Sequence, residues 1–296
     1  MITLSTRIHP PVTKKAWLRI DASDALIDAE TIGAIWNRRR ERPKLLMAYE
    51  AQVELSMVKE CNASLDSFFS LLHGAVWVSS PSAVRSASSK AEQLYRAAGL
   101  GFNIPESCFT NDRRTIQEFM EAMGGDGSIV YKPHTSIMIR RGDGDIDVVY
   151  TRRLTRRDLN NHAITGEIPG IYQRYVPKRF DYRVTVVGSH LFACRIWSQQ
   201  SEFSTVDVRA QPWKSHPLRH EPVELDPVVS RQCIKLVQSY GLAFGAIDLA
   251  EDDDGRMFFL ELNPNGQWAW IEEATELPIA SAICDIFESA ASRSVS

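Results

Sequence analysis

Two carboxylates and an amide near the C-terminal end of the sequence are the residues best placed to do chemistry. Asp248 lies in the apolar segment GAIDL, and Glu261 and Asn263 lie further along in FFLELN. The intervening EDDDG is a turn signal, so we expect a hairpin that sets Asp248 beside Glu261 on one face of a sheet. Two carboxylates this close repel each other unless they hold a cation or share a proton.

The donor set indicates which cation this would be. Oxygen-bearing side chains without a nearby His or Cys suit Mg²⁺, which keeps waters and is completed by substrate phosphates. The alternative is a solvated strand face on which Asn263 caps the turn. Strict alternation along the second strand would place Phe258, Leu260 and Leu262 on one face, and Phe259, Glu261 and Asn263 on the other.

These side chains must be positioned by a strand-rich C-terminal half. The runs GIYQRYVP, DYRVTVVGSHLFACRIWS and FGAIDLAEDDDGRMFFLELN indicate strands joined mostly as hairpins. One helix is expected after the cap residue Asp226, with Pro227 at its first position and its end at Gly241, and another helix follows Pro278. Because strands and helices do not alternate regularly, we predict an α+β arrangement rather than a doubly wound sheet.

A smaller α+β unit is predicted over residues 82–168. The spacing of alanine and leucine predicts a helix over 82–98 that is stopped by Gly99 and Gly101, and a second helix follows over 110–125. The segments SIVYKP, SIMIRR and DIDVVYT are predicted strands, the last two joined by a Gly-Asp-Gly turn.

Two residues of this unit are notable. The second helix is expected to take Thr110 or Asn111 as its cap. Lys132 interrupts the apolar strand SIVYKP just before a proline, which is an unusual place for a surface lysine. Before this unit, the first eighty residues are less regular, with short strands in KAWLRI, TIGAIW and GAVWVS and a helix through AYEAQVELSMVKECNASLDSFFSLL.

The amino-acid composition narrows the class of protein to which the chain belongs. The 296 residues are 44% hydrophobic with a net charge of −3, values of an ordinary globular chain that give no reason to expect nucleic acid or a membrane as partner. No apolar run is long enough for a membrane span and the first residues lack a secretory signal, which favours a cytoplasmic location. The scattered, odd set of cysteines argues against a disulfide framework and a zinc site: Cys61, Cys108, Cys194, Cys233 and Cys284.

The hairpin GAIDL…FLELNPN resembles the metal-binding hairpin of the ATP-grasp ligases. In that family an Asp, a Glu and an Asn hold magnesium ions that bridge nucleotide phosphates, so the resemblance assigns Asp248, Glu261 and Asn263 to Mg²⁺ and implies ATP as cofactor. The other implied positions are Lys90 and Lys132 at phosphate, Gln173, Arg174, Tyr175 and Val176 at the base, Asp181 at the ribose, and Arg183 and Arg195 at the transferred phosphate.

Within the superfamily, the run ELNPNGQWAWIEEATELPIA resembles the maturases of graspetide (microviridin-type) ribosomal peptides, as do IWNRRR, VWVSSP and TVDVR. The Trp-rich continuation is not expected in RimK-type glutamate ligases. The resemblance implies an ATP-grasp fold in three parts: a shortened Rossmann-like pre-ATP-grasp domain over 1–81, a central subdomain over 82–168 and a C-terminal subdomain over 169–296. The first domain is expected to be short because only thirty-five residues precede Trp36.

The resemblance also implies a reaction. ATP phosphorylates an Asp or Glu side chain of a precursor peptide, and a Ser or Thr hydroxyl or a Lys amine attacks the acyl phosphate to close an ester or amide ring. Trp268 and Trp270 are candidates for a wall of the peptide site, with plain core packing as the alternative. A leader segment of the precursor would meet basic residues of the central unit, unless these form a solvated face: Arg140, Arg141, Arg152, Arg153, Arg156 and Arg157.

Two other hypotheses stay open at this point. One is a RimK-like amino-acid or peptide ligase that acts without a leader. The other is a catalytically silent ATP-grasp domain that binds peptide, against which the complete set of lysine, arginine and metal-site residues argues. The sequence leaves a homodimer open and favours neither nucleic acid nor a membrane as partner.

Overall fold

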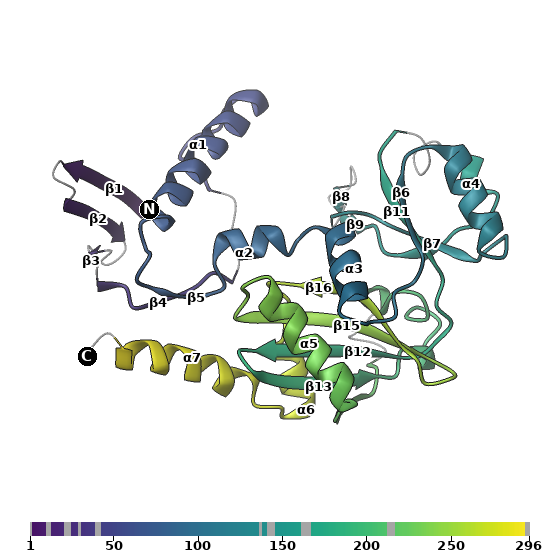
Figure 1. Cartoon of the computed structure of the whole chain (residues 1–296). Helices are drawn as coiled ribbons and strands as arrows, with labels where there is room; N and C mark the ends of the chain where they lie inside the picture. Colours follow the sequence, from purple (N-terminus) through teal and green to yellow (C-terminus); the bar gives the residue numbers. More distant parts are fainter. Residues whose placement is uncertain are drawn as a thin grey trace.

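The computed structural model describes residues 2–9, 13–20, 25–28, 31–38, 43–135, 138–140, 146–160, 167–211 and 217–293. Its largest element is a five-stranded antiparallel sheet in the order β14-β13-β12-β15-β16 (Figure 1). The strands are β12 (Lys178–Val187), β13 (His190–Ile196), β14 (His220–Val223), β15 (Phe244–Asp252) and β16 (Met257–Asn263). The strand-rich C-terminal half predicted from the sequence is therefore confirmed.

The two faces of this sheet differ because side chains alternate along each strand. Helices α3 and α5 cover one face, where Tyr182, Val184 and Leu249 are buried in the main core. Helices α6 and α7 cover part of the other face, around Val187 and Phe244. These helices are α3 (Lys90–Gly99), α5 (Pro227–Ser239), α6 (Ala269–Thr275) and α7 (Ile279–Arg293).

The two helices predicted in the C-terminal half are both present. Asp226 caps α5 by accepting the backbone N–H of Val228 at 2.7 Å, and α5 gives way to Gly241 in the left-handed conformation (φ 69°). Helix α7 begins directly after Pro278. Among the helices that the structure describes, none is long and apolar enough to cross a membrane.

A smaller four-stranded sheet follows the order β10-β7-β11-β6 and is packed by helix α4 through Ile116 and Met120. Its elements are β6 (Ser107–Thr110), α4 (Arg113–Ala122), β7 (Ile129–Lys132), β10 (Arg152–Arg153) and β11 (Gly170–Arg174). Strand β8 (Met138–Arg140) pairs with β9 (Ile146–Val148), and the predicted Gly-Asp-Gly turn between them lies outside the described residues. Strand β11 leads directly into β12 of the large sheet.

The predicted helix over 82–98 is corrected to two helices, α2 (Pro81–Ser86) and α3. The helix is interrupted at Ser88 and Ser89. Ser88 bonds through its hydroxyl to the carbonyl of Val84 at 2.7 Å, and Ser89 occupies the cap position of α3 with an extended backbone. Serine competes with the helix for backbone hydrogen bonds, which explains why the apolar spacing continues while the helix does not.

The cap of α4 also differs from the prediction. Asp112, rather than Thr110 or Asn111, accepts the backbone N–H of Thr115 at 2.8 Å. A carboxylate at this position satisfies an unpaired donor of the first turn and interacts favourably with the positive end of the helix dipole. The hydroxyl of Thr110 instead accepts the N–H of Asp112 at 2.9 Å and so orients the capping residue.

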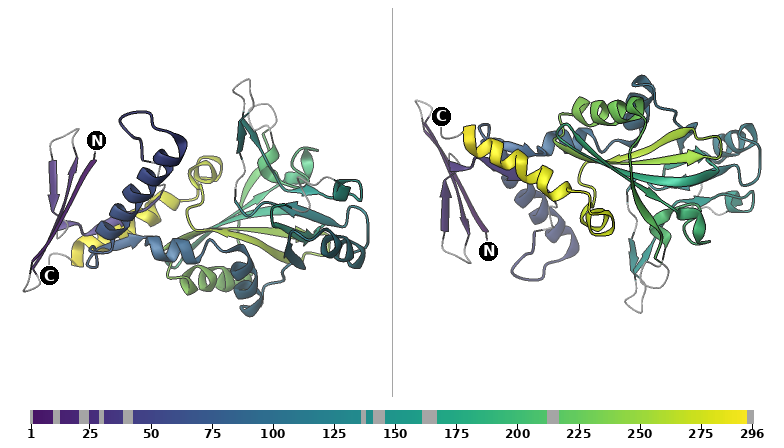
Figure 2. Two further views of the ribbon diagram at one scale, coloured as in Figure 1. Left: turned by 90° about the horizontal axis from the view of Figure 1, so that it is seen from above. Right: turned by 90° about the horizontal axis from the view of Figure 1, so that it is seen from below.

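The N-terminal part contains two small sheets. One is antiparallel and consists of β1 (Ile2–His9), β2 (Thr13–Ile20) and β3 (Ala25–Asp28). The other pairs β4 (Ala34–Trp36) with β5 (Val76–Val78) in parallel, with helix α1 (Ala51–Phe69) between them in the chain. This strand–helix–strand order is the one expected of a Rossmann-like segment. Helix α7 runs alongside this segment (Figure 2). The ring centroids of Phe287 in α7 and Trp36 are 6.3 Å apart.

Strand β16 does not alternate strictly. Asp248 pairs with Glu261, whereas Leu249 pairs with Phe259, so Leu260 is an extra residue in the strand. Such a bulge reverses the facing of the residues beyond it. Phe259 is therefore fully buried in the main core together with Leu262, and its predicted place on the face of Glu261 is wrong.

The outer edge of β16 is held by single residues rather than by another strand: the carbonyl of Asn103 accepts the N–H of Phe259 at 2.9 Å, and a side chain holds Leu262. Gln93 of α3 accepts the N–H of Leu262 at 2.9 Å and donates to the carbonyl of Leu262 at 2.8 Å. Gln93 is almost fully buried, so no water replaces these bonds. Since Leu262 lies between Glu261 and Asn263, this clamp fixes the strand segment that carries both.

We predict that Gln93→Leu destabilises the chain by about 2–4 kcal/mol, because two buried backbone groups lose their partners. Chemical denaturation would measure the change in the free energy of unfolding. The control is Gln238→Leu on α5, an exposed side chain with one long bond to Gly188, for which we expect less than about 0.5 kcal/mol. Equal effects of the two substitutions would contradict the clamp.

Candidate active site

The hairpin of β15 and β16 brings the two predicted carboxylates side by side. Asp248 and Glu261 are direct cross-strand partners, as the turn between the segments predicts. The amide of Asn263 donates to Oε1 of Glu261 at 2.8 Å and to Oδ2 of Asp248 at 3.2 Å. Three oxygen-bearing side chains therefore converge on one spot of the sheet.

Each carboxylate is paired with a cation from a different element. Nζ of Lys90 lies 2.7 Å from Oε2 of Glu261, and Nη1 of Arg183 lies 2.7 Å from Oδ1 of Asp248. Burial alone would raise the pKa of Glu261, but the ammonium of Lys90 holds it well below its usual range. For Asp248, burial outweighs the guanidinium of Arg183 and raises the pKa. Glu261 is the more firmly ionised member of the pair.

The loop after Asn263 fixes the position of Arg183. Nη2 of Arg183 donates to the carbonyl oxygen of Gln267 at 3.1 Å. A β-carbon on Gly266 would come within 2.6 Å of that Nη2 atom and 2.5 Å of the β-carbon of Ala246. Only glycine fits this close approach, so the Asn-Pro-Asn-Gly segment is shaped around the guanidinium.

A second polar group comes from the smaller sheet. Lys132, at the end of β7, donates to Oε1 of Gln173 at 2.7 Å, and Nε2 of Gln173 donates to Oγ of Ser107 at 2.9 Å. Burial lowers the pKa of Lys132 to about 8, although the charge of Glu261 acts in the opposite direction. The charge of Lys90 lowers it further, so the two predicted phosphate lysines are close enough to influence each other.

Three further residues of the site were not predicted from the sequence. Lys178 forms a buried ion pair of 2.7 Å with Asp181, the residue expected at the ribose. Asp207 and Arg209 form another ion pair of 2.7 Å, and the charge of Arg209 helps to lower the pKa of Glu261. Arg209 thus belongs to the electrostatic surroundings of the carboxylate pair. The sequence signal that could have pointed to Asp207 and Arg209 is the segment TVDVR, which resembles the graspetide maturases.

The residues expected at the base lie at the end of β11 and just after it. Arg174 is exposed and pairs with Glu106 at 3.4 Å, and the guanidinium of Arg153 lies 4.3 Å from the ring centroid of Tyr175. Val176 is half-buried. The side chains of Arg174 and Tyr175 are thus engaged by other residues, and a role of this segment at a base would depend on its backbone.

Arg195 does not join this group, contrary to expectation. It pairs across strands with Tyr182, whereas Arg183 pairs with Asp248, and neighbouring residues of a strand face opposite sides of the sheet. Nε of Arg195 donates to the hydroxyl of Tyr182 at 2.9 Å, and Nη1 lies 3.8 Å from Glu221. The structure thus places Arg195 on the opposite face of the sheet from Asp248 and Arg183.

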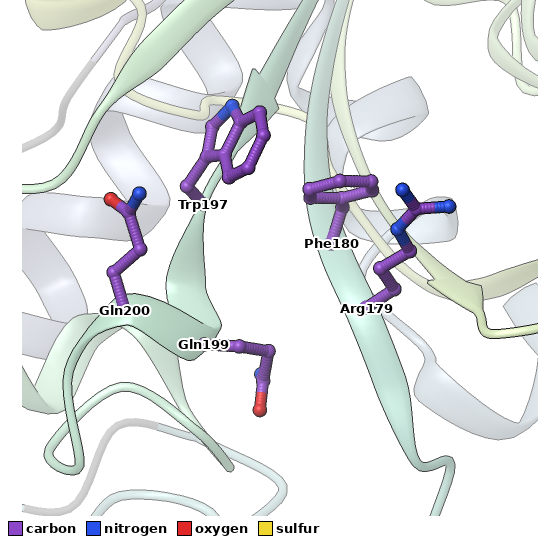
Figure 3. Close-up of a pocket in the computed structure, with 5 residues that line it drawn as sticks. All are labelled: Arg179, Phe180, Trp197, Gln199 and Gln200. Carbon is purple, nitrogen blue, oxygen red and sulfur yellow. The ribbon is translucent and has the colours of Figure 1, made fainter.

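The face of Arg195 also holds a pocket of about 290 Å³, lined by Arg179, Phe180, Trp197, Gln199 and Gln200 (Figure 3). The guanidinium of Arg195 lies 4.9 Å from the ring centroid of Phe180. The pocket is therefore on the opposite side of the sheet from the carboxylate pair and is not part of the candidate site.

The donor set of Asp248, Glu261 and Asn263 fits Mg²⁺. Two carboxylates and one amide supply three oxygen ligands and leave positions for water and phosphate oxygens. To act as a ligand, Asn263 must turn its amide oxygen toward the cation, because its nitrogen now donates to both carboxylates. Nowhere in the described chain do three His, Cys, Asp or Glu side chains gather as an alternative metal site.

No protein-family model and no curated protein sequence matches the chain. Several solved structures do match the chain. The macrocyclase MdnC from Microcystis aeruginosa, bound with the precursor peptide MdnA, is 26% identical, with a TM-score of 0.83 over 96% of this chain and 86% of that chain. A RiPP-associated ATP-grasp ligase from Chryseobacterium gregarium, solved with ADP and a leader and core peptide, is 27% identical, with a TM-score of 0.84 over 96% and 84%.

The ATP-grasp ligase PsnB, solved with a minimal precursor, Mg and ADP, is 20% identical, with a TM-score of 0.72 over 97% of this chain and 84% of that chain, a likeness of fold alone. Together the matches show that the chain has the ATP-grasp fold. It resembles ribosomal-peptide macrocyclases along nearly its whole length. The predicted fold class and the family resemblance are confirmed.

We predict that the affinity for ADP with Mg²⁺ falls as the pH rises through about 8, because the Lys132 ammonium then loses its charge. Lys132→Met should bind about tenfold more weakly near neutral pH, the scale of one lost charge-assisted bond, and show a flatter pH profile. Calorimetric titration gives both quantities. The control is Lys235→Met, an exposed lysine of α5. A variant that keeps the wild-type pH profile would contradict this placement of Lys132.

Proposed function

We propose that this ATP-grasp ligase activates Asp or Glu side chains of a ribosomal precursor peptide with ATP and closes macrocycles on them. The observation that carries the proposal is the convergence of Asp248, Glu261 and Asn263 beside the cations Lys90 and Arg183. The similarity to a macrocyclase solved with its precursor and to a ligase solved with ADP and peptides supports it.

In the first step a peptide carboxylate oxygen attacks the γ-phosphorus of ATP, an acyl phosphate forms, and ADP leaves. Bound Mg²⁺ would neutralise charge on the phosphates and hold them in line. Asp248, Glu261 and Asn263 would hold the cation, while Lys90 and Lys132 contact phosphate oxygens. Such fixed charges act strongly because the site is partly buried and its groups need little rearrangement.

Negative charge is spread over the oxygens of the transferred phosphoryl group and develops on the leaving ADP, and two guanidinium groups are suited to stabilise it. Arg183 is held by Asp248 and by the carbonyl of Gln267, and Arg209 is held by Asp207. In the second step a Ser or Thr hydroxyl, or a Lys amine, attacks the acyl carbon. The new ester or amide bond forms, inorganic phosphate leaves, and the nucleophile gives up one proton.

Nucleotide binding in this proposal uses the junction between the two sheets. Gln173 joins Lys132 to Ser107 and so positions the lysine, and Asp181 is held by Lys178 at the start of β12. The backbone of residues 174–176 would receive the base. These assignments follow from the family resemblance and from the short connection between β11 of the smaller sheet and β12 of the large sheet.

A peptide leader is proposed to contact the central unit, but few of its predicted arginines are available. Arg152 pairs with Asp158, Arg156 pairs with Glu121, and Arg153 donates to the carbonyl of Gly127. Arg157 is exposed, while Arg141 and the side chain of Arg140 lie outside the described residues. Of the described candidates, Arg157 is the one best suited to meet an acidic leader residue.

A RimK-like ligase and a silent peptide-binding domain remain the competing hypotheses. The first would act on a free amino acid or a short peptide without a leader. The second would bind peptide and release no ADP. Incubation with Mg-ATP and a peptide encoded beside the gene separates them, because only the proposed macrocyclase releases ADP and removes water from that peptide.

We predict that Glu261→Gln and Arg183→Met each lower ADP release at least a hundredfold, since one lost electrostatic contact in the transition state costs about that much. Glu261→Gln should keep the wild-type melting profile, whereas Arg183→Met leaves Asp248 without its cation and should lower the melting temperature. Arg195→Met is the matched control: the same substitution on the same sheet, but on the opposite face, should leave more than about half of the activity. Coupled ADP detection and peptide mass spectrometry measure the outcome. Full activity in Glu261→Gln would refute the assignment.

A further inference from the structure

A cationic and aromatic cluster lies at the end of β4. The guanidinium carbon of Arg38 is 5.5 Å from the ring centroid of Trp36 and 5.8 Å from that of Trp268. The two indoles are stacked with centroids 6.3 Å apart, and Phe287 of α7 contacts Trp36 from another side. The rings therefore give the arginine a firm support.

This cluster adjoins the loop that leaves the carboxylate hairpin. With its amide nitrogen turned toward the N-terminal part, Asn265 donates to the carbonyl oxygen of Asn37 at 3.0 Å. Asn265 is two residues from Asn263, and Trp268 follows in the same loop. The N–H of Asn37 donates to the carbonyl of Val78 at 3.0 Å, which ties the segment to β5 as well. The backbone of Asn37 thus anchors the chain beside this loop, and Arg38 is the next residue.

The positive charge of Arg38 is available to bind an anion. Its side chain is exposed, and among the residues that the structure describes no acidic group lies within ion-pair distance of it. Trp36 is 39% exposed, an unusual state for so large an apolar ring. A guanidinium held against aromatic rings keeps its N–H edge open, and that edge matches the two oxygens of a carboxylate.

We propose that Arg38, supported by Trp36 and Trp268, binds a side-chain carboxylate of the substrate peptide. The inference rests on the proposed function, which makes the substrate an acidic peptide whose Asp and Glu residues must be brought to the site. The occupant is a carboxylate that is not itself phosphorylated. Arg38 is therefore a recognition residue that holds the peptide near the metal hairpin.

The cluster favours this occupant over simple core packing. A core role would bury Trp36 and pair Arg38 with an acid of the chain, and neither is found among the described residues. The indole N–H of Trp268 is also buried without an acceptor in the described chain. A donor-rich aromatic cluster whose arginine has no acidic partner among the described residues matches a negatively charged ligand with a small apolar stem.

The probe is a synthetic hexapeptide of alternating Thr and Glu, compared with its Thr and Gln counterpart, titrated calorimetrically into the full chain with Mg-ADP. We expect the Glu peptide to bind at least tenfold more tightly than the Gln peptide. Arg38→Met should remove this difference, and Arg38→Lys should restore part of it, because the charge returns without the planar fork. The control Arg114→Met changes an exposed arginine of α4 and should bind like the wild type.

Two results would overturn the proposal: equal binding of the two peptides by the wild type, or a charge preference that survives in Arg38→Met. Uptake of Mg-ADP is recorded in the same experiment and should be unchanged in every variant. If the chain takes up no Mg-ADP yet discriminates the peptides through Arg38, the proposed ligase function fails while this recognition site stands.

Discussion

The structure depends on keeping two carboxylates next to each other on one sheet face. Asp248 and Glu261 are cross-strand partners, and their repulsion is offset by Arg183 from β12, Lys90 from α3 and the amide of Asn263. Each neutralising group comes from a different element, so β12, helix α3 and the end of β16 must all be in place. The fold therefore depends on the charge balance among the same residues that would carry out the chemistry.

Strand alternation then separates the chemistry from the core. In β12, Tyr182 faces the main core and Arg183 faces the carboxylates, and the bulge at Leu260 lets Phe259 and Leu262 both reach the core while Glu261 stays at the site. The buried clamp of Gln93 closes the outer edge of this bulged strand at Leu262. The site is thus built on rigid elements, as positioning of reacting groups requires.

Much of this could be predicted from the sequence. The hairpin with Asp248 opposite Glu261 follows from turn signals and apolar runs, and α5 follows from Asp226 and Pro227. The bulge at Leu260 could not be predicted, because one inserted residue leaves the composition of the strand unchanged. The sequence likewise does not show which face of the sheet the side chain of Arg195 lies on, because this depends on the register of Arg195 with Tyr182. Arg209 was missed because it lies within a three-residue helical turn, which is too short for any periodicity to indicate where its side chain points.

Calorimetric titration of ADP into the chain, with and without Mg²⁺, tests most directly whether the three oxygen donors hold a cation under a nucleotide. The account predicts uptake of ADP that depends on Mg²⁺ in the wild type and loses that dependence when Asp248 is replaced by Asn. Uptake of ADP that is the same with and without Mg²⁺, or a dependence that persists after the replacement, would contradict it.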